Sequence, residues 1–188
     1  ASPIVGYGDS EFLIDVDQQD GVDPLVLVSN LNSFAFDYLA RSKIGGTNIN
    51  FYVLKQLPIV PPSLRMPSEA ITCRAYELSF TGWDIASSVS ASDEHCSYCF
   101  RWDDERRFWL RAELDALYFH LYGIERDDVD YIMETFPIVK RKDEEKYGCY
   151  RTKDAILEIY DEMARCRAEG REYETRLDPP PAHPSLAH

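Results

Sequence analysis

Apolar residues recur at helical spacing near the start of the chain and then change to a short continuous run. The helical repeat consists of Leu27, Leu31, Phe34, Tyr38 and Leu39. Gly45-Gly46 supplies the backbone freedom that ends a helix. The short run consists of Phe51, Val53, Leu54 and Leu57, and the prolines at 58, 61 and 62 end it. This pattern predicts a buried helix, a polar glycine loop and a strand.

Four further helices are predicted downstream. Ser68 is a suitable cap for a helix over about 69–80, with Ile71, Ala75 and Leu78 on one face, before Gly82. A long helix begins at Asp103 and ends near Gly123, with one charged face and one apolar face formed by Leu110, Leu114, Leu117 and Leu121. A short helix spans about 127–135, and a last helix spans about 152–167, with Ile156, Tyr160 and Met163 on its buried side. Residues between the last two helices form a basic connector.

Two strand-like pieces, IVGYG and FLIDV, precede these elements. Together with the strand at 51–57, they predict an α+β chain, with a small strand-helix-strand part followed by a mainly helical part. The expected divisions are 1–65, a helix and loop connector at 66–100, a helical part at 101–170, and a disordered tail at 171–188 that ends in DPPPAHPSLAH.

Composition narrows the class of protein. A chain of 188 residues that is 45% hydrophobic is long enough to bury a core. It contains no continuous apolar stretch of the ~18 residues that a membrane span requires, and its first residues do not resemble a secretory leader, so we expect a cytoplasmic protein. Five scattered cysteines do not form a disulfide framework, so we expect reduced thiols.

Few residues suggest catalysis or metal binding. Cys96 and Cys99 form a CxxC beside His95, which is half of a zinc site, but no second half is present in the sequence. We therefore expect no metal site and a surface loop with free thiols. Asp103, Asp104 and Glu105 complement the dipole at a helix start, so no catalytic residue is predicted.

Charge is distributed unevenly. The net charge of −13 opposes binding to a phosphate backbone, yet residues 26–65 carry four basic residues and only Asp37 as an acid. Candidate nucleic-acid contacts are therefore the residues around the glycine loop, namely Arg41, Lys43, Thr47, Asn48, Asn50 and Lys55. Asparagine can bind adenine through two hydrogen bonds, but asparagine is also common in turns, so we expect a scaffold role for this loop first and a base contact second. A second basic cluster, Lys140-Arg141-Lys142, fits either phosphate contacts or a solvated connector.

Two blocks of the sequence resemble one family. The segments LNSFAFDYLARSKIGGTNINFYVLKQLPIVPP, RFWLRAELDALYFHLYGI and YIMETFPIVKRKDEEKYGCYRTKDAILEIYD are similar to the C-terminal region of large adenine-specific (N6) DNA methyltransferases of type II, IIG-like, restriction-modification and related phage-defence systems. The similarity covers roughly residues 26–62 and 101–162. The chain lacks the Asn-Pro-Pro-aromatic motif with which such enzymes hold a flipped adenine, and it has no glycine-rich nucleotide loop.

The resemblance implies a non-catalytic specificity or accessory fragment that helps to position double-stranded DNA. S-adenosylmethionine would be the cofactor of the parent enzyme, and no cofactor is expected in this chain. The expected partners are DNA, the remainder of the methyltransferase, and a restriction or defence-system subunit, with no membrane. The alternative is an acidic helical module that docks on a partner subunit or on the methylase body.

Overall fold

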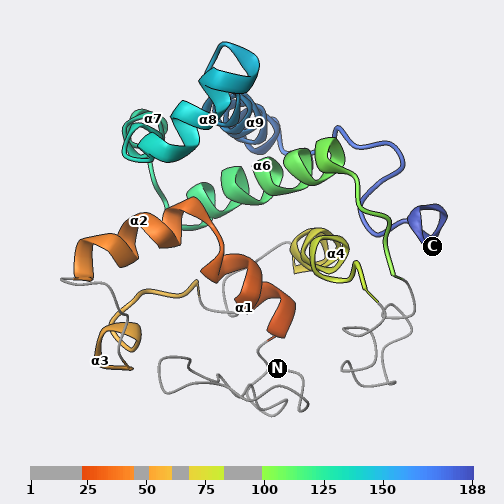
Figure 1. Ribbon diagram of the computed structural model, residues 1–188, viewed down its shortest axis with the longest axis horizontal. Coiled ribbons are helices and arrows are strands. Elements are labelled where there is room, and N and C mark those ends of the chain that lie inside the picture. Colours follow the sequence, from red (N-terminus) through yellow and green to blue (C-terminus); the bar gives the residue numbers. More distant parts are fainter. Residues whose placement is uncertain (1–22, 45–50, 61–67, 83–98) are drawn as a thin grey trace.

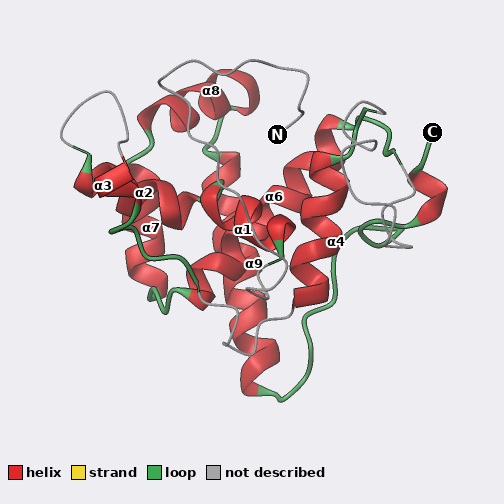
Figure 2. Cartoon of the chain, turned by 90° about the horizontal axis from the view of Figure 1, so that it is seen from below, coloured by secondary structure: helices red, strands yellow, loops and turns green. Residues whose placement is uncertain are grey.

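The computed structural model describes residues 23–44, 51–60, 68–82 and 99–188, and these residues form helices joined by loops (Figure 2). The α-helices are α1 (Pro24–Leu31), α2 (Phe34–Lys43), α3 (Phe51–Leu54), α4 (Ser68–Ser79), α6 (Asp104–Leu121), α7 (Arg126–Glu134), α8 (Pro137–Tyr147) and α9 (Arg151–Ala168). A 3₁₀ turn, η3 (Pro184–Leu186), follows near the C-terminus. The described residues therefore form an all-α fold.

Helix α6 is the central element of this fold. In Figure 1 it lies between α7, α8 and α9 on one side and α1, α2 and α4 on the other. Asp103 caps it by accepting a hydrogen bond of 2.9 Å from the amide of Arg106. Gly123, just beyond its end, has a φ of +67°, which glycine adopts without the strain that a side chain would add. The predicted helix from Asp103 to Gly123 is confirmed.

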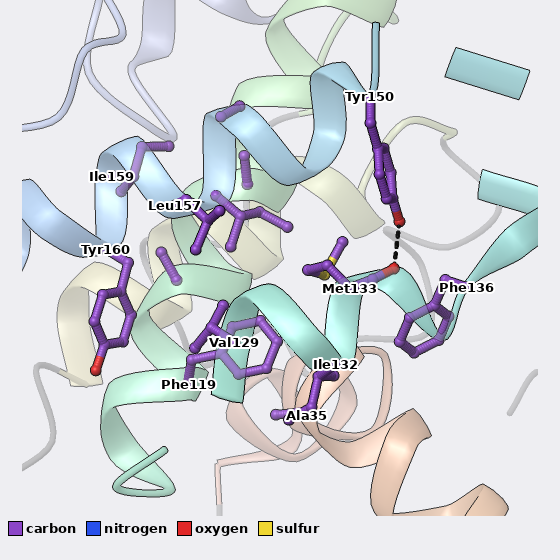
Figure 3. Packing of buried hydrophobic residues seen from close by; sticks show 14 residues of the cluster. Ala35, Phe119, Val129, Ile132, Met133, Phe136, Tyr150, Leu157, Ile159 and Tyr160 are labelled. Atoms are coloured by element: carbon purple, nitrogen blue, oxygen red, sulfur yellow. Dashed lines mark hydrogen bonds between the residues drawn. The ribbon is translucent and has the colours of Figure 1, made fainter. Parts of the chain in front are cut away.

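The main hydrophobic core joins helices from both ends of the sequence. Figure 3 shows Ala35 of α2, Phe119 of α6, Ile132 and Met133 of α7, and Ile159 of α9 in one cluster. Tyr150 closes its edge and donates a hydrogen bond of 2.8 Å to the carbonyl of Met133. Burying each large apolar side chain stabilises the fold by about 1.5–3 kcal/mol. The segments before residue 65 and after residue 101 thus share one core.

The first predicted helix is in fact two helices. The chain turns at Asn32 and Ser33, and the hydroxyl of Ser33 caps α2 by accepting a hydrogen bond of 3.2 Å from the amide of Phe36. Ser and Asn favour such caps because their side chains replace missing backbone partners. The break rotates the buried face, so Leu27 and Leu31 are only half-buried, while Ser29 and Asn30 are buried.

The predicted strand at 51–57 is wrong, and so is the α+β fold class. Residues 51–54 form α3, and Leu54 and Leu57, three positions apart, pack on Phe36 and Ala40 of α2. A short apolar run fits either a helix or a strand, and the spacing of the buried pair is helical. The described residues contain no sheet, only an isolated bridge between Phe100 and Ala187. The strand-like pieces IVGYG and FLIDV lie outside the described residues.

Two C-terminal segments also differ from expectation. The basic connector is helix α8, which starts at Pro137, a residue suited to the first helical turn, and ends at Gly148 in the left-handed conformation. The tail at 171–188 is not disordered, because Tyr173, Thr175 and Ala182 hydrogen-bond to buried carboxylates of α4 and α6. The predicted helices at 69–80, 127–135 and 152–167 are confirmed as α4, α7 and α9.

Candidate functional site: basic segments and a groove along helix α6

The first candidate segment begins at the C-terminal end of α2. Arg41 forms an ion pair of 2.7 Å with Asp37, and its guanidinium lies 4.5 Å from the ring centre of Phe136. Arg41 is therefore engaged within the protein. Lys43 and Lys55 are exposed, and neither has an ion-pair partner among the described residues. These two lysines are the available cations of this segment.

Thr47, Asn48 and Asn50 lie outside the described residues, but both ends of the segment that contains them are placed. Helix α2 leads into it and α3 follows it, and Leu54 of α3 and Leu57 just beyond α3 pack on Phe36 and Ala40 of α2. The packing holds Lys43 and Lys55 at the two ends of one segment. The proposed base contacts of Asn48 and Asn50 stay a prediction.

The second candidate segment, on α8, is largely paired. Lys140 forms an ion pair of 2.7 Å with Glu134, and Arg141 lies 3.7 Å from Glu145. Hydrogen bonds from Lys140 and Lys153 lower the pKa of Glu134. Lys142 has no ion-pair partner among the described residues. Exposed pairs of this kind contribute about 0–1 kcal/mol each, so they reduce the free charge of the segment without immobilising it.

A groove that the sequence did not reveal runs along one face of α6. Its volume is about 1040 Å³, and α1, α2, α4 and α8 form its walls. Its apolar lining includes Phe34, Leu78, Phe108 and Val139. Arg107, Arg111 and Asp115 follow each other at intervals of four residues on α6, which is the spacing of one helix face, and this repeat is the sequence signal that we missed.

Aromatic rings and cations meet at the end of the groove where α6 begins. Trp102, 60% exposed, stacks 3.9 Å from the guanidinium carbon of Arg107. The guanidinium of Arg151 lies 4.1 Å from the ring centre of Phe108 and 4.8 Å from that of Tyr147. Such contacts between a cation and a ring contribute roughly 0.5–2 kcal/mol. They keep these side chains in fixed positions around the groove.

Buried carboxylates lie beside and within the groove. Glu113 is 0% exposed and pairs with Arg74, while Asp115 lines the groove and accepts a hydrogen bond of 2.8 Å from the amide of Phe34. Burial raises the pKa of Asp115 to about 7, against the opposing influence of the Phe34 amide and of Arg111. Asp115 is thus protonated in part near neutral pH. The charged face predicted for this helix is not wholly exposed to solvent.

The described residues show no cluster of three or more His, Cys, Asp or Glu side chains suited to a metal ion. Cys73, Cys99, Cys149 and Cys166 are free thiols, and Cys99 and Cys166 are buried. His95 and Cys96 lie outside the described residues. Among the helices of the described part, none is both long and apolar enough to cross a membrane.

Comparison with known proteins adds no relative. No family model matches the chain, and no curated protein and no solved structure is significantly similar to it.

Proposed function

We propose that this chain is a non-catalytic helical region of a DNA adenine methyltransferase of a restriction-modification or phage-defence system, and that it holds the segment from Arg41 to Lys55 against DNA. The supporting observation is that the two blocks with family resemblance, 26–62 and 101–162, pack into one core. In the parent enzyme, S-adenosylmethionine would supply the methyl group. The proposal implies a cytoplasmic protein.

Polar contacts also connect the two blocks of sequence, 26–62 and 101–162. The hydroxyls of Ser29 and Tyr118 lie 2.6 Å apart, and the side-chain amide of Asn30 donates to the hydroxyl of Tyr122 at 2.9 Å. Asp115 of α6 accepts the hydrogen bond from the first amide of α2. Buried hydrogen bonds of this kind restrict how α1 and α2 sit on α6. A rigid α2 suits a scaffold that presents Lys43 and Lys55.

The local charge also supports a DNA contact at this segment. Lys43 and Lys55 are not neutralised by ion pairs with described residues, whereas Lys140 and Arg141 are paired. In a chain of net charge −13, contact with DNA must be local, and the remainder of the methyltransferase would supply most of the attraction. Weak binding that falls steeply with salt is therefore expected.

The test is fluorescence anisotropy of a labelled duplex at increasing salt. Changing Lys43→Ala and Lys55→Ala together should weaken binding and reduce the slope of log K against log salt by about 2 in magnitude, because two phosphate contacts are lost. The matched control is Lys140→Ala with Arg141→Ala, which removes the same charge from paired positions and should have a smaller effect. Equal effects of the two double variants on the affinity and its salt dependence would show that DNA does not bind specifically at Lys43 and Lys55.

A separate observation tests the family. The coding region upstream should contain an Asn-Pro-Pro-aromatic motif within the same reading frame, and calorimetry should detect no binding of S-adenosylmethionine to this chain alone. Saturable binding at micromolar concentration would contradict the non-catalytic assignment.

The second candidate function is docking on a partner subunit of the restriction or defence system, or on the methylase body. The ion pairs that join α7, α8 and α9 favour it, because they leave a mixed-charge surface rather than a basic one. Under this alternative, Lys43 and Lys55 are dispensable for partner binding.

A further inference from the structure

The charged residues of the groove along α6 differ in how far the protein itself satisfies them. Each acid there has an internal donor. Asp104 accepts from the indole of Trp102 at 2.8 Å, Glu105 pairs with Arg151, Asp143 accepts from the amide of Thr152 at 2.6 Å, and Asp115 accepts from the amide of Phe34. These acids therefore need no external partner.

The cations of the groove form no ion pair with any carboxylate among the described residues. Arg107 donates one hydrogen bond of 3.0 Å to the carbonyl of Leu78, but its buried Nε–H has no acceptor in the described part of the chain. Arg111 is exposed, and it lies near enough to Arg107 to lower the pKa of that guanidinium, although desolvation lowers it more. Lys146 lies 4.9 Å from the ring centre of Tyr147 and forms no ion pair with a described residue. Asp104 and Glu77 lie near enough to Arg107 to oppose this fall in its pKa, but neither Arg107 nor Arg111 forms an ion pair with a described carboxylate. Two neighbouring guanidiniums without such a direct partner favour an external anion.

Asp115 only partly neutralises the positive charge of Arg111. It is the nearest acid to Arg111 on the same helix face, four residues away, but no ion pair forms between them. Its raised pKa means that its carboxyl is partly neutral near pH 7. Arg111 is therefore available to a ligand.

Apolar side chains and small polar ones such as Ser29, Ser33 and Ser79 share the lining between the charged edges of the groove. The apolar part of the lining consists of Ala75 and Leu78 of α4, Ala112 and Leu114 of α6, and Val139 of α8. Val28 of α1 also lines the groove, and its side chain is 45% exposed. A volume of about 1040 Å³ lies at the upper end of the range for small-molecule sites, which hold about 300–1,000 Å³. A groove of this size, with apolar side chains in its walls and cations beside them, has the properties of a site for an amphipathic helical peptide.

We propose that the groove along α6 binds an amphipathic helix of a partner protein, which places apolar side chains between α4 and α8 and carboxylates against Arg107, Arg111 and Lys146. Nucleic acid fits less well, because a phosphate at every nucleotide would also meet Asp104, Glu105 and Asp143. A peptide carries carboxylates only where the cations lie. This site is separate from the Arg41 to Lys55 segment, so peptide binding in the groove can be tested independently of the proposed DNA contact.

The experiment selects binders from a phage-displayed library of random peptides against the whole chain. We expect enriched sequences to combine apolar residues at helical spacing with two or more acids. The best sequence is then made as a labelled synthetic peptide, and its affinity is measured by anisotropy. Arg111→Glu should weaken binding at least tenfold, because it replaces attraction to a carboxylate with repulsion. Val28→Glu should also weaken it by placing a charge at the apolar wall.

The matched control is Lys142→Glu, which makes the same charge change on α8 at a position that does not line the groove, and affinity should stay within twofold. Arg111, Val28 and Lys142 are all exposed, so circular dichroism should show unchanged folding. The proposal is overturned if enriched peptides lack acids, if Arg111→Glu leaves their affinity unchanged, or if the groove instead binds labelled oligothymidine in an Arg111-dependent manner.

Discussion

Arg74 of α4 and Glu113 of α6 form an ion pair of 2.7 Å in which both side chains are almost completely buried. The carboxylate of Glu113 also accepts hydrogen bonds from Tyr173 at 3.0 Å, from Thr175 at 2.9 Å, and from the amide of Arg176 at 3.0 Å. One buried charge thus fastens α4 and the C-terminal segment to the central helix. Burial of such a charge is tolerated only because every acceptor site is used.

Removing the charge of Glu113 should destabilise the fold strongly. Glu113→Gln leaves Arg74 buried without a counter-charge, which costs about 3–5 kcal/mol in the free energy of unfolding. Urea denaturation followed by circular dichroism measures the loss. The control Glu145→Gln breaks the exposed pair with Arg141 and should cost less than about 1 kcal/mol. Similar losses in both variants would show that the buried pair contributes no more to the free energy of unfolding than the exposed pair does.

The phenol of Tyr173 should contribute to stability through its bond to Glu113. Tyr173→Phe removes one hydrogen bond to a buried charged group, which is worth about 1.5–3 kcal/mol. Tyr131→Phe is the matched control, because Tyr131 is 62% exposed and its hydroxyl bonds to no buried charge in the described part of the chain. Thermal unfolding should separate the two variants by several degrees. A control as damaging as Tyr173→Phe would argue against docking of the C-terminal segment.

Asp115 should make stability depend on pH. Its folded pKa of about 7 lies above its ordinary value of 3.8, so the folded chain retains a proton that the unfolded chain releases between about pH 4 and pH 7. The stabilisation that this retained proton provides has its full value below about pH 4, and it is lost as the pH rises to and through about 7. Asp115→Asn keeps an oxygen that can accept from Phe34 but does not ionise. This variant should exceed the wild type by about 4 kcal/mol in the free energy of unfolding at pH 8 and match it near pH 4 in urea titrations. A constant difference across that range would contradict the assignment.

Asn30 should stabilise the packing of the 26–62 block on the 101–162 block, whereas Asn32 should contribute little to it. Asn30 is buried, donates to Tyr122, and accepts from the amide of Val60 at 3.1 Å. Asn30→Ala leaves the Val60 amide without this acceptor and removes one of the two partners of the Tyr122 hydroxyl, which also donates to the carbonyl of Pro58. The change should cost about 1–3 kcal/mol, with faster hydrogen exchange at Val60. Asn32→Ala removes only an exposed bond to the carbonyl of Val28 and serves as the control. Unchanged exchange at Val60 in Asn30→Ala would show that the contact is dispensable.

The sequence by itself determined the long helices. Asp103 and Gly123 mark the two ends of α6 by capping chemistry, which is local and does not depend on distant residues. The apolar repeats of α4 and α9 likewise predicted their buried faces, since Ile71, Ala75 and Ile156 are buried. The clustering of available positive charge at Lys43 and Lys55 was also visible from sequence.

Tertiary packing alone decided the remaining features. The segment from Phe51 to Leu54 forms a helix and Leu57 follows it in a turn, because α2 offers Leu54 and Leu57 an apolar surface, while the described residues offer no neighbouring strand. Glu113 and Asp115 are buried because Arg74, the Phe34 amide and the C-terminal segment supply donors from distant positions. A carboxylate that is charged and exposed on an isolated helix becomes part of a core only when such donors converge on it. The groove has the same origin, since its walls come from helices that meet only in the folded chain.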